Sequence, residues 1–117
     1  MLIRSLIVLL CVAAPALADV PVIQNVNMSQ SGDLWRFDVT IKHDDKGWDD
    51  YADAWRIIDA NGKDLGTRDL AHPHVDEQPF TRSLSNVRIP ADVTEIGIQV
   101  HDTINGWSPN IKRIKLR

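Results

Sequence analysis

The sequence predicts an all-β fold, a seven-stranded antiparallel sandwich of two sheets, from three observations. Apolar and polar residues alternate with the period of a strand, turn signals separate the alternating segments, and these segments recur roughly every 8–12 residues. The expected strands occupy residues 22–28, 35–41, 51–57, 65–71, 81–89, 96–100 and 111–116.

Three of these strands are strongly patterned. In 35–41 and 96–100 every second side chain is apolar and the side chains between are mostly polar or charged, which is typical of a strand with one buried face. The segment 51–57 carries Trp55, which we expect to anchor the core, and is followed by Asp-Ala-Asn-Gly, a strong turn signal. The last segment, 111–116, alternates basic with apolar residues, as suits a charged edge strand that resists aggregation.

Residues 1–18 have the pattern of a secretory signal peptide. Arg4 supplies the positive start, 6–14 form a short apolar core, and an Ala-Leu-Ala site predicts cleavage after Ala18. The apolar core is too short to span a bilayer, so we expect no membrane insertion after cleavage. The expected product is a periplasmic or secreted protein with one sandwich domain over 19–117.

The cysteine count and the charge limit what this product can be. Cys11 is the only cysteine, and bulky Leu10 precedes it where a lipid-attachment site would need a small residue. We therefore interpret Cys11 as part of the leader and expect the sandwich to be stable without disulfides. Without Arg4 the chain has 12 basic and 16 acidic side chains, a net charge of −4. This acidic balance argues against nucleic acid or anionic lipid as a partner.

All four histidines lie where an expected strand ends. They are His43, His72, His74 and His101. Because alternate loops of an antiparallel sandwich lie at the same end, the loops 43–50, 72–79 and 101–110 are expected together. The opposite end has neither histidine nor tryptophan. The pattern therefore predicts a binding site at one end of the sandwich.

Metal binding is the leading hypothesis for this end. Imidazole and carboxylate groups without thiolate suit Cu²⁺ or Zn²⁺. Asp44 and Asp102 are candidate ligands, or hydrogen-bond partners that hold a ring in one tautomer. Strand parity favours a different interpretation: His43 continues an inward register, whereas His101 faces outward and Asp102 inward. The imidazoles would then cap the core or bond to neighbouring turns.

A ligand or protein interaction module is the second hypothesis. Trp48 and Trp107 each follow a glycine in an expected loop, where two exposed indoles would form a stacking platform. The alternative, which we favour for both, is that each indole folds back over the core as a plug, since a small domain needs its large side chains for burial.

Two further classes have less support. The acidic segment 44–50 carries enough oxygens for Ca²⁺, but its spacing is not that of an EF-hand, and a solvated acidic rim explains it. A catalytic triad would need Ser83 or Ser85, which alternate on an ordinary strand with no Gly-x-Ser-x-Gly motif. We therefore expect no catalysis, and a metal ion, a small ligand or a protein as the partner.

Two resemblances accompany these predictions. The seven-strand pattern with Trp55 in the third strand resembles the immunoglobulin/fibronectin type III superfamily over residues 20–117, without the cysteine pair of antibody domains. It implies a fold and no function. The stretch HPHVDEQPFTRSL, residues 72–84, and the two loops with His-Asp followed by Gly-Trp resemble those of small, uncharacterised exported bacterial proteins.

Overall fold

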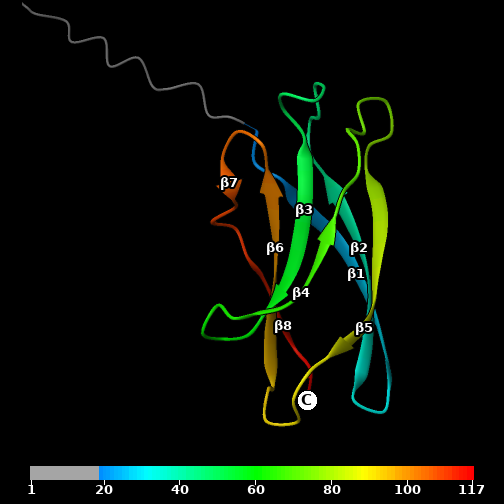
Figure 1. The fold of residues 1–117 in the computed structure, drawn as a ribbon, viewed down its shortest axis with the longest axis vertical. Coiled ribbons are helices and arrows are strands. Elements are labelled where there is room, and N and C mark those ends of the chain that lie inside the picture. The colour runs from blue at the N-terminus through cyan, green and yellow to red at the C-terminus, as the bar shows by residue number, and fades with distance from the viewer. Residues whose placement is uncertain (1–18) are drawn as a thin grey trace, which may run out of the picture.

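The computed structural model describes residues 19–117, and the signal peptide predicted for 1–18 lies outside them. Within these residues, eight strands form two antiparallel sheets (Figure 1). The first sheet has the order β1-β2-β5, with β1 (Val22–Ser31), β2 (Leu34–Lys42) and β5 (Phe80–Arg88). Over 19–117 there is no helix of the length and apolarity that a bilayer crossing requires.

The second sheet has the order β4-β3-β6-β7, and β8 also pairs with β6. Its strands are β3 (Ala52–Ile58), β4 (Asp64–Asp69), β6 (Glu95–Asp102), β7 (Gly106–Trp107) and β8 (Lys112–Lys115). The all-β, two-sheet prediction is confirmed.

The strand count and several strand ends differ from the prediction: β1, for example, continues to Ser31, three residues beyond its expected end. The extra strand is β7, two residues long, inside the segment expected as the loop 101–110. It pairs with the last two residues of β6, His101 and Asp102, which lie on the strand and not in the loop. Backbone pairing thus extends beyond the point where the apolar alternation stops.

The core fills the space between the sheets, as the alternation predicts. Trp55 is fully buried, as are Phe37 of the first sheet and Ile98 of the second. Their neighbours on the same faces complete one cluster to which both sheets contribute. Trp55 is therefore the core anchor that the sequence predicts.

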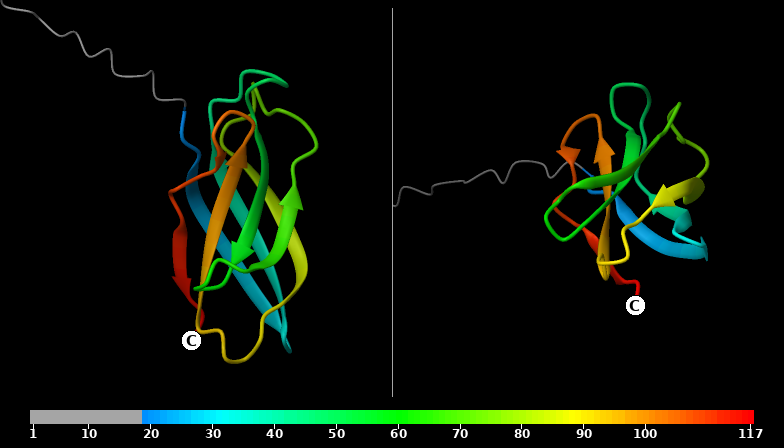
Figure 2. Two further views of the ribbon diagram at one scale, coloured as in Figure 1. Left: turned by 60° about the vertical axis from the view of Figure 1, so that its left-hand side comes forward. Right: turned by 60° about the horizontal axis from the view of Figure 1, so that its bottom comes forward.

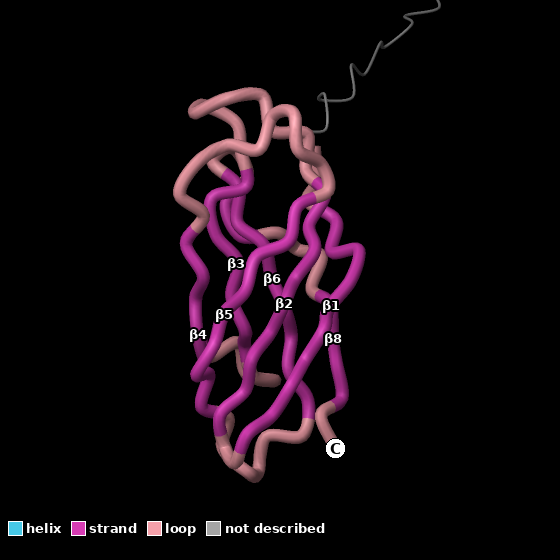
Figure 3. The backbone as a smooth tube through the Cα atoms, turned by 90° about the vertical axis from the view of Figure 1, so that its right-hand side faces the viewer, coloured by secondary structure: helices cyan, strands magenta, loops and turns pink. Residues whose placement is uncertain are grey.

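The two flanks of the sandwich differ. At one flank β4 lies beside β5, so the sheets approach each other (Figure 3). At the other flank the edges are β1 and β8, and a groove opens between them. The loops after β2, β4 and β6 lie together at one end, and the turns after β1, β3 and β5 lie at the other (Figures 1 and 2). This confirms the grouping of loops expected from antiparallel order.

Candidate functional site

A buried carboxylate, Asp45, is the centre of the loop end. Its side chain has no exposed surface. Oδ1 accepts hydrogen bonds from His43 Nδ1 at 2.6 Å and from the Ala52 backbone N–H at 2.9 Å. Oδ2 accepts from the His74 backbone N–H at 2.8 Å. A buried carboxylate needs several such donors to offset its desolvation. Asp45 therefore ties the β2–β3 loop to the β4–β5 loop.

Gln78 makes the second link between the same loops. Its Oε1 accepts from the His43 backbone N–H at 3.0 Å, and its Nε2 donates to the His74 carbonyl at 2.9 Å. The Gln78–Pro79 peptide bond is cis. The polar groups at the start of the HPHVDEQPFTRSL stretch therefore serve as partners for the β2–β3 loop.

The ring of His74 is held by Phe80 and Arg82. Its ring stacks on Phe80, with centroids 3.9 Å apart and planes within 7°, and its Nε2 accepts from the Arg82 guanidinium at 2.8 Å. Because Nε2 accepts, the ring proton is on Nδ1, which lies 3.9 Å from Asp45 Oδ2 and has no hydrogen-bond partner in residues 19–117. Burial first, then the charge of Arg82 and the His72 ring, lower the pKa of His74 below 6.5. His74 is therefore a neutral, packed ring.

The other two histidines lie outside this buried group. His72 is exposed, with its ring centroid 4.6 Å from that of His74, and its Nδ1 donates to the Pro73 carbonyl at 3.0 Å. His101 faces away from the core on β6, where Nδ1 pairs with the Asp53 carboxylate. Its ring meets Trp107 edge-on, with centroids 4.9 Å apart. The opposite parities predicted for His43 and His101 are confirmed.

The two aspartates proposed as metal ligands have structural partners. Asp102 is fully buried and accepts from the backbone N–H groups of Ile104 and Asn105, at 2.9 and 2.6 Å, which fixes the β6–β7 turn. Asp44 is exposed and pairs with Lys46 at 3.0 Å. Within residues 19–117, no group of three or more histidine, aspartate or glutamate side chains is placed to hold a metal ion. The structure therefore does not assemble the predicted four-histidine site.

The two loop tryptophans have different environments. Trp48 is 67% exposed at the tip of the β2–β3 loop and meets Tyr51 edge-on, with ring centroids 5.7 Å apart. Trp107 is half-buried beneath Arg56, whose guanidinium carbon lies 3.9 Å from the ring centroid. The preference for a plug is therefore wrong for Trp48. Trp107 lies over the outer face of the second sheet.

Each loop of this end also exposes one large apolar side chain. These are Trp48 after β2, Val75 after β4 and Ile104 after β6, with exposed fractions of 67%, 51% and 54%. We call these three residues the apolar crown. Val75 and Ile104 were not predicted from the sequence, because the alternation of apolar and polar residues carries no information on side chains in loops. Their only signal is an aliphatic residue at a loop tip where polar residues are usual.

Comparisons with known proteins give one informative match. No protein-family model and no solved structure matches the chain. A protein of Halomicrobium mukohataei named "Putative lipoprotein" is 36% identical over 91 residues, which cover 78% of this chain and 44% of that protein. The chain thus spans less than half the length of this relative. The resemblance to the immunoglobulin/fibronectin type III superfamily stays a prediction.

Proposed function

We propose that this protein is an exported, non-catalytic interaction module that binds another protein through the apolar crown. The observation that carries the proposal is the exposure of Trp48, Val75 and Ile104, one from each loop of the same end. Exposed apolar side chains that gather at one place on a surface mark an interaction site. Tryptophan is also the residue type most enriched among the energetic anchors of protein interfaces.

The buried network beneath the crown supports this role. Asp45 and Gln78 fix the β2–β3 and β4–β5 loops to each other, and Asp102 fixes the β6–β7 turn. Loops that are already ordered lose little conformational entropy on binding, which favours affinity. On this proposal the histidines and aspartates hold the loops in place, and the exposed apolar side chains make the contact.

The charge around the crown indicates a basic partner surface. Exposed carboxylates flank the crown on two loops: Asp44, Asp49, Asp76 and Glu77. An acidic rim attracts a basic protein surface and repels anionic lipid, and its contribution weakens as salt rises. The partner proposed is therefore a protein with an apolar patch inside a basic rim.

The proposal also includes export of the protein from the cytoplasm. The leader-like residues 1–18 support it, and so does the similarity to a protein named as a lipoprotein. A periplasmic or secreted location follows if the leader is cleaved after Ala18. Mass spectrometry of the protein from cell fractions tests this: an N-terminus at Asp19 supports cleavage, and a retained leader or a lipid adduct on Cys11 contradicts it.

The interaction is tested by placing a photo-crosslinking amino acid at Val75 in cells that produce the protein. We expect one discrete adduct, lost in Trp48→Ala and retained in Lys63→Ala, because Lys63 is exposed in the turn after β3, at the opposite end from the crown. With the partner purified, Trp48→Ala should weaken binding by about 2 kcal/mol, roughly thirtyfold. Adducts that persist in Trp48→Ala would contradict the proposal.

Binding of Cu²⁺ or Zn²⁺ stays a separate prediction of the sequence. The pair of rings that could share an ion is His72 and His74, but His74 Nε2 already accepts from Arg82 and its Nδ1 is buried. An ion there would have to displace Arg82 or enter the buried network. We therefore rank metal binding below the interaction module.

A further inference from the structure

The outer edge of the first sheet is unpaired. Within residues 19–117, β1 pairs only with β2, so the backbone groups on its other side have no strand partner. β1 has 10 residues, and after a register shift between Ile23 and Asn25 its pairing with β2 is regular to Ser31. Such an edge is a template for an added strand, because only an extended backbone satisfies a row of free N–H and C=O groups.

The composition of β1 also differs from that of the other edges. Its sequence, VIQNVNMSQS, has no charged residue. Apart from the two-residue β7, the other edge strands carry charges that discourage strand addition: DLGTRD in β4, FTRSLSNVR in β5 and KRIK in β8. Proteins normally protect long edges with charge or proline. The long edge formed by β1 therefore lacks the charged residues that would discourage strand addition.

The core is also incompletely covered beside this edge. Val26 and Met28 pair with Val39 and Phe37, so they lie on the inner face of the sheet. Val39 and Phe37 are fully buried, whereas Val26 is half-buried and Met28 is 38% exposed. The inner face of the first sheet is therefore less buried at β1 than at β2. A strand added beside β1 would bury the exposed apolar surface of Val26 and Met28.

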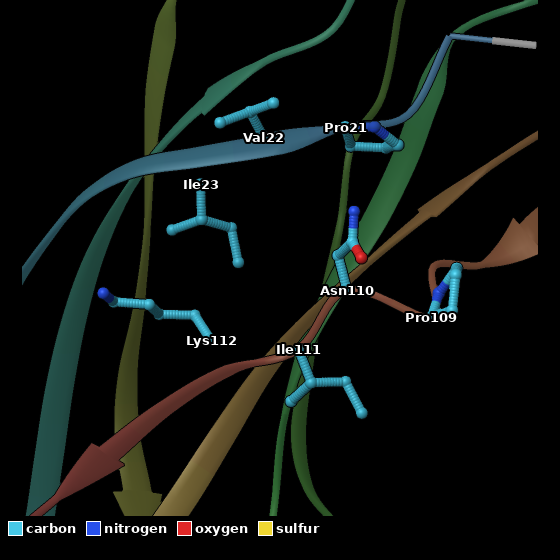
Figure 4. Close-up of a pocket in the computed structure, with 7 residues that line it drawn as sticks. All are labelled: Pro21, Val22, Ile23, Pro109, Asn110, Ile111 and Lys112. Carbon is cyan, nitrogen blue, oxygen red and sulfur yellow. The ribbon is translucent and has the colours of Figure 1, made fainter.

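A groove runs along the same flank, between β1 and the segment before β8 (Figure 4). It has a volume of about 440 Å³, and its apolar lining includes Val22, Ile23, Pro109 and Ile111. The segment carrying Ile111 lies tightly on β6, because a Cβ at Gly97 would be 2.6 Å from Ile111 Cγ2. The far wall of the groove is therefore firmly positioned. Among residues 19–117, Lys112 is the one charged residue in its lining.

We propose that β1 binds an extended, acidic peptide segment of a partner protein as an additional strand of the first sheet. Main-chain hydrogen bonds to the free edge would hold the segment, and its side chains beside Val22 and Ile23 would enter the groove. Apolar side chains fit the lining, and an acidic side chain would pair with Lys112. This site lies on a flank of the sandwich and does not depend on the apolar crown.

Charge favours this occupant over a second copy of the chain. Beside the groove, β8 contributes Lys112, Arg113 and Lys115 within four residues, in a protein whose net charge is −3. In a two-fold pair joined through β1, the same basic flank would be present on both copies, and like charges would be brought together on one side. An acidic segment gains attraction from that flank.

The test uses a labelled peptide of about nine residues that alternates valine with threonine and carries three glutamates, long enough to cover most of β1. Fluorescence anisotropy against residues 19–117 should show saturable binding. A peptide methylated at alternate backbone amides should bind at least roughly tenfold more weakly, since it cannot complete the ladder. Equal binding of the methylated peptide, or no binding of either, would overturn the proposal.

Matched variants then test the groove. Lys112→Glu should weaken binding of the acidic peptide roughly two- to fivefold and strengthen binding of a peptide with lysines in place of glutamates. Lys63→Glu, the same change in the distant β3–β4 turn, should alter neither. Trp48→Ala should leave peptide binding intact, which separates this site from the crown. A stable dimer through β1 in sedimentation, blocking the peptide, would contradict the choice of occupant.

Discussion

Two histidine–aspartate pairs of this protein use the same chemistry in opposite environments. His43 and Asp45 are 1% and 0% exposed inside the loop end, whereas His101 and Asp53 are 30% and 28% exposed on the outer face of the second sheet. Strand parity makes the difference, since His43 follows β2 in the inward register of that strand and His101 faces outward on β6. The buried pair, His43 and Asp45, therefore contributes to the stability of the fold, whereas the pair of His101 and Asp53 is a surface interaction.

The largest expected effect comes from removing the buried carboxylate. Asp45→Ala leaves His43 Nδ1 and the backbone N–H groups of Ala52 and His74 without an acceptor. We expect a loss of about 3–5 kcal/mol in the free energy of unfolding, measured by urea denaturation. Asp44→Ala, which removes the exposed neighbour, should stay within about 0.5 kcal/mol of the parent. Equal losses for both variants would show that Asp45 is not a structural centre.

The pH dependence of stability tests the role of the buried histidine His74. Because burial and Arg82 lower the native pKa of His74 below 6.5, the unfolded chain takes up this proton first as the pH falls. The contribution of His74 is therefore complete above pH 6.5 and is lost below it. Urea midpoints at successive pH values should fall more steeply in the parent than in His74→Gln. If His72→Gln, on the exposed neighbour, flattens the profile equally, the assignment to His74 is wrong.

The exposed pair should matter much less to stability. Asp53→Asn removes the charge opposite His101, where solvent screens the interaction. We expect a change below about 1 kcal/mol in the free energy of unfolding. A loss as large as that of Asp45→Ala would mean that exposure does not separate the two pairs.

The smallest effect on stability is expected at Trp48. Its indole is 67% exposed, so Trp48→Ala should change the free energy of unfolding by no more than about 0.5 kcal/mol. Acrylamide quenching of the parent should show one strongly accessible indole that the variant lacks, since Trp35 and Trp55 are buried. Destabilisation by several kcal/mol would instead support the plug that the structure argues against.

The fold was predictable from the sequence because alternation reports which face of a strand is buried. It placed Trp55 in the core, turned His43 inward and His101 outward, and grouped the three loops at one end. The strand β7 was not predictable in this way, since two residues are too few to show a period.

The site was predictable only in part, because its geometry depends on contacts between distant loops. The bond from the His74 backbone to Asp45 joins residues 29 apart in the chain. Asp45 continues the inward register of Ile41 and His43 and Asp44 does not, but that parity does not show which backbone groups Asp45 binds. The exposure of Trp48 likewise depends on the path of a loop. Strand order was enough to group the three loops at one end, whereas the contacts among their side chains could not be predicted from it.

The central claim is that the histidines of the loop end hold the structure and that exposed apolar side chains make the contact. Unfolding of residues 19–117 with and without 
Zn²⁺ or Cu²⁺ tests it directly, since an ion bound only by the native state at 100 times its Kd adds about 2.7 kcal/mol to the free energy of unfolding. We predict an unchanged unfolding midpoint in about 100 μM of either ion. A rise of that size, abolished when His72 and His74 are replaced by alanine, would contradict the account.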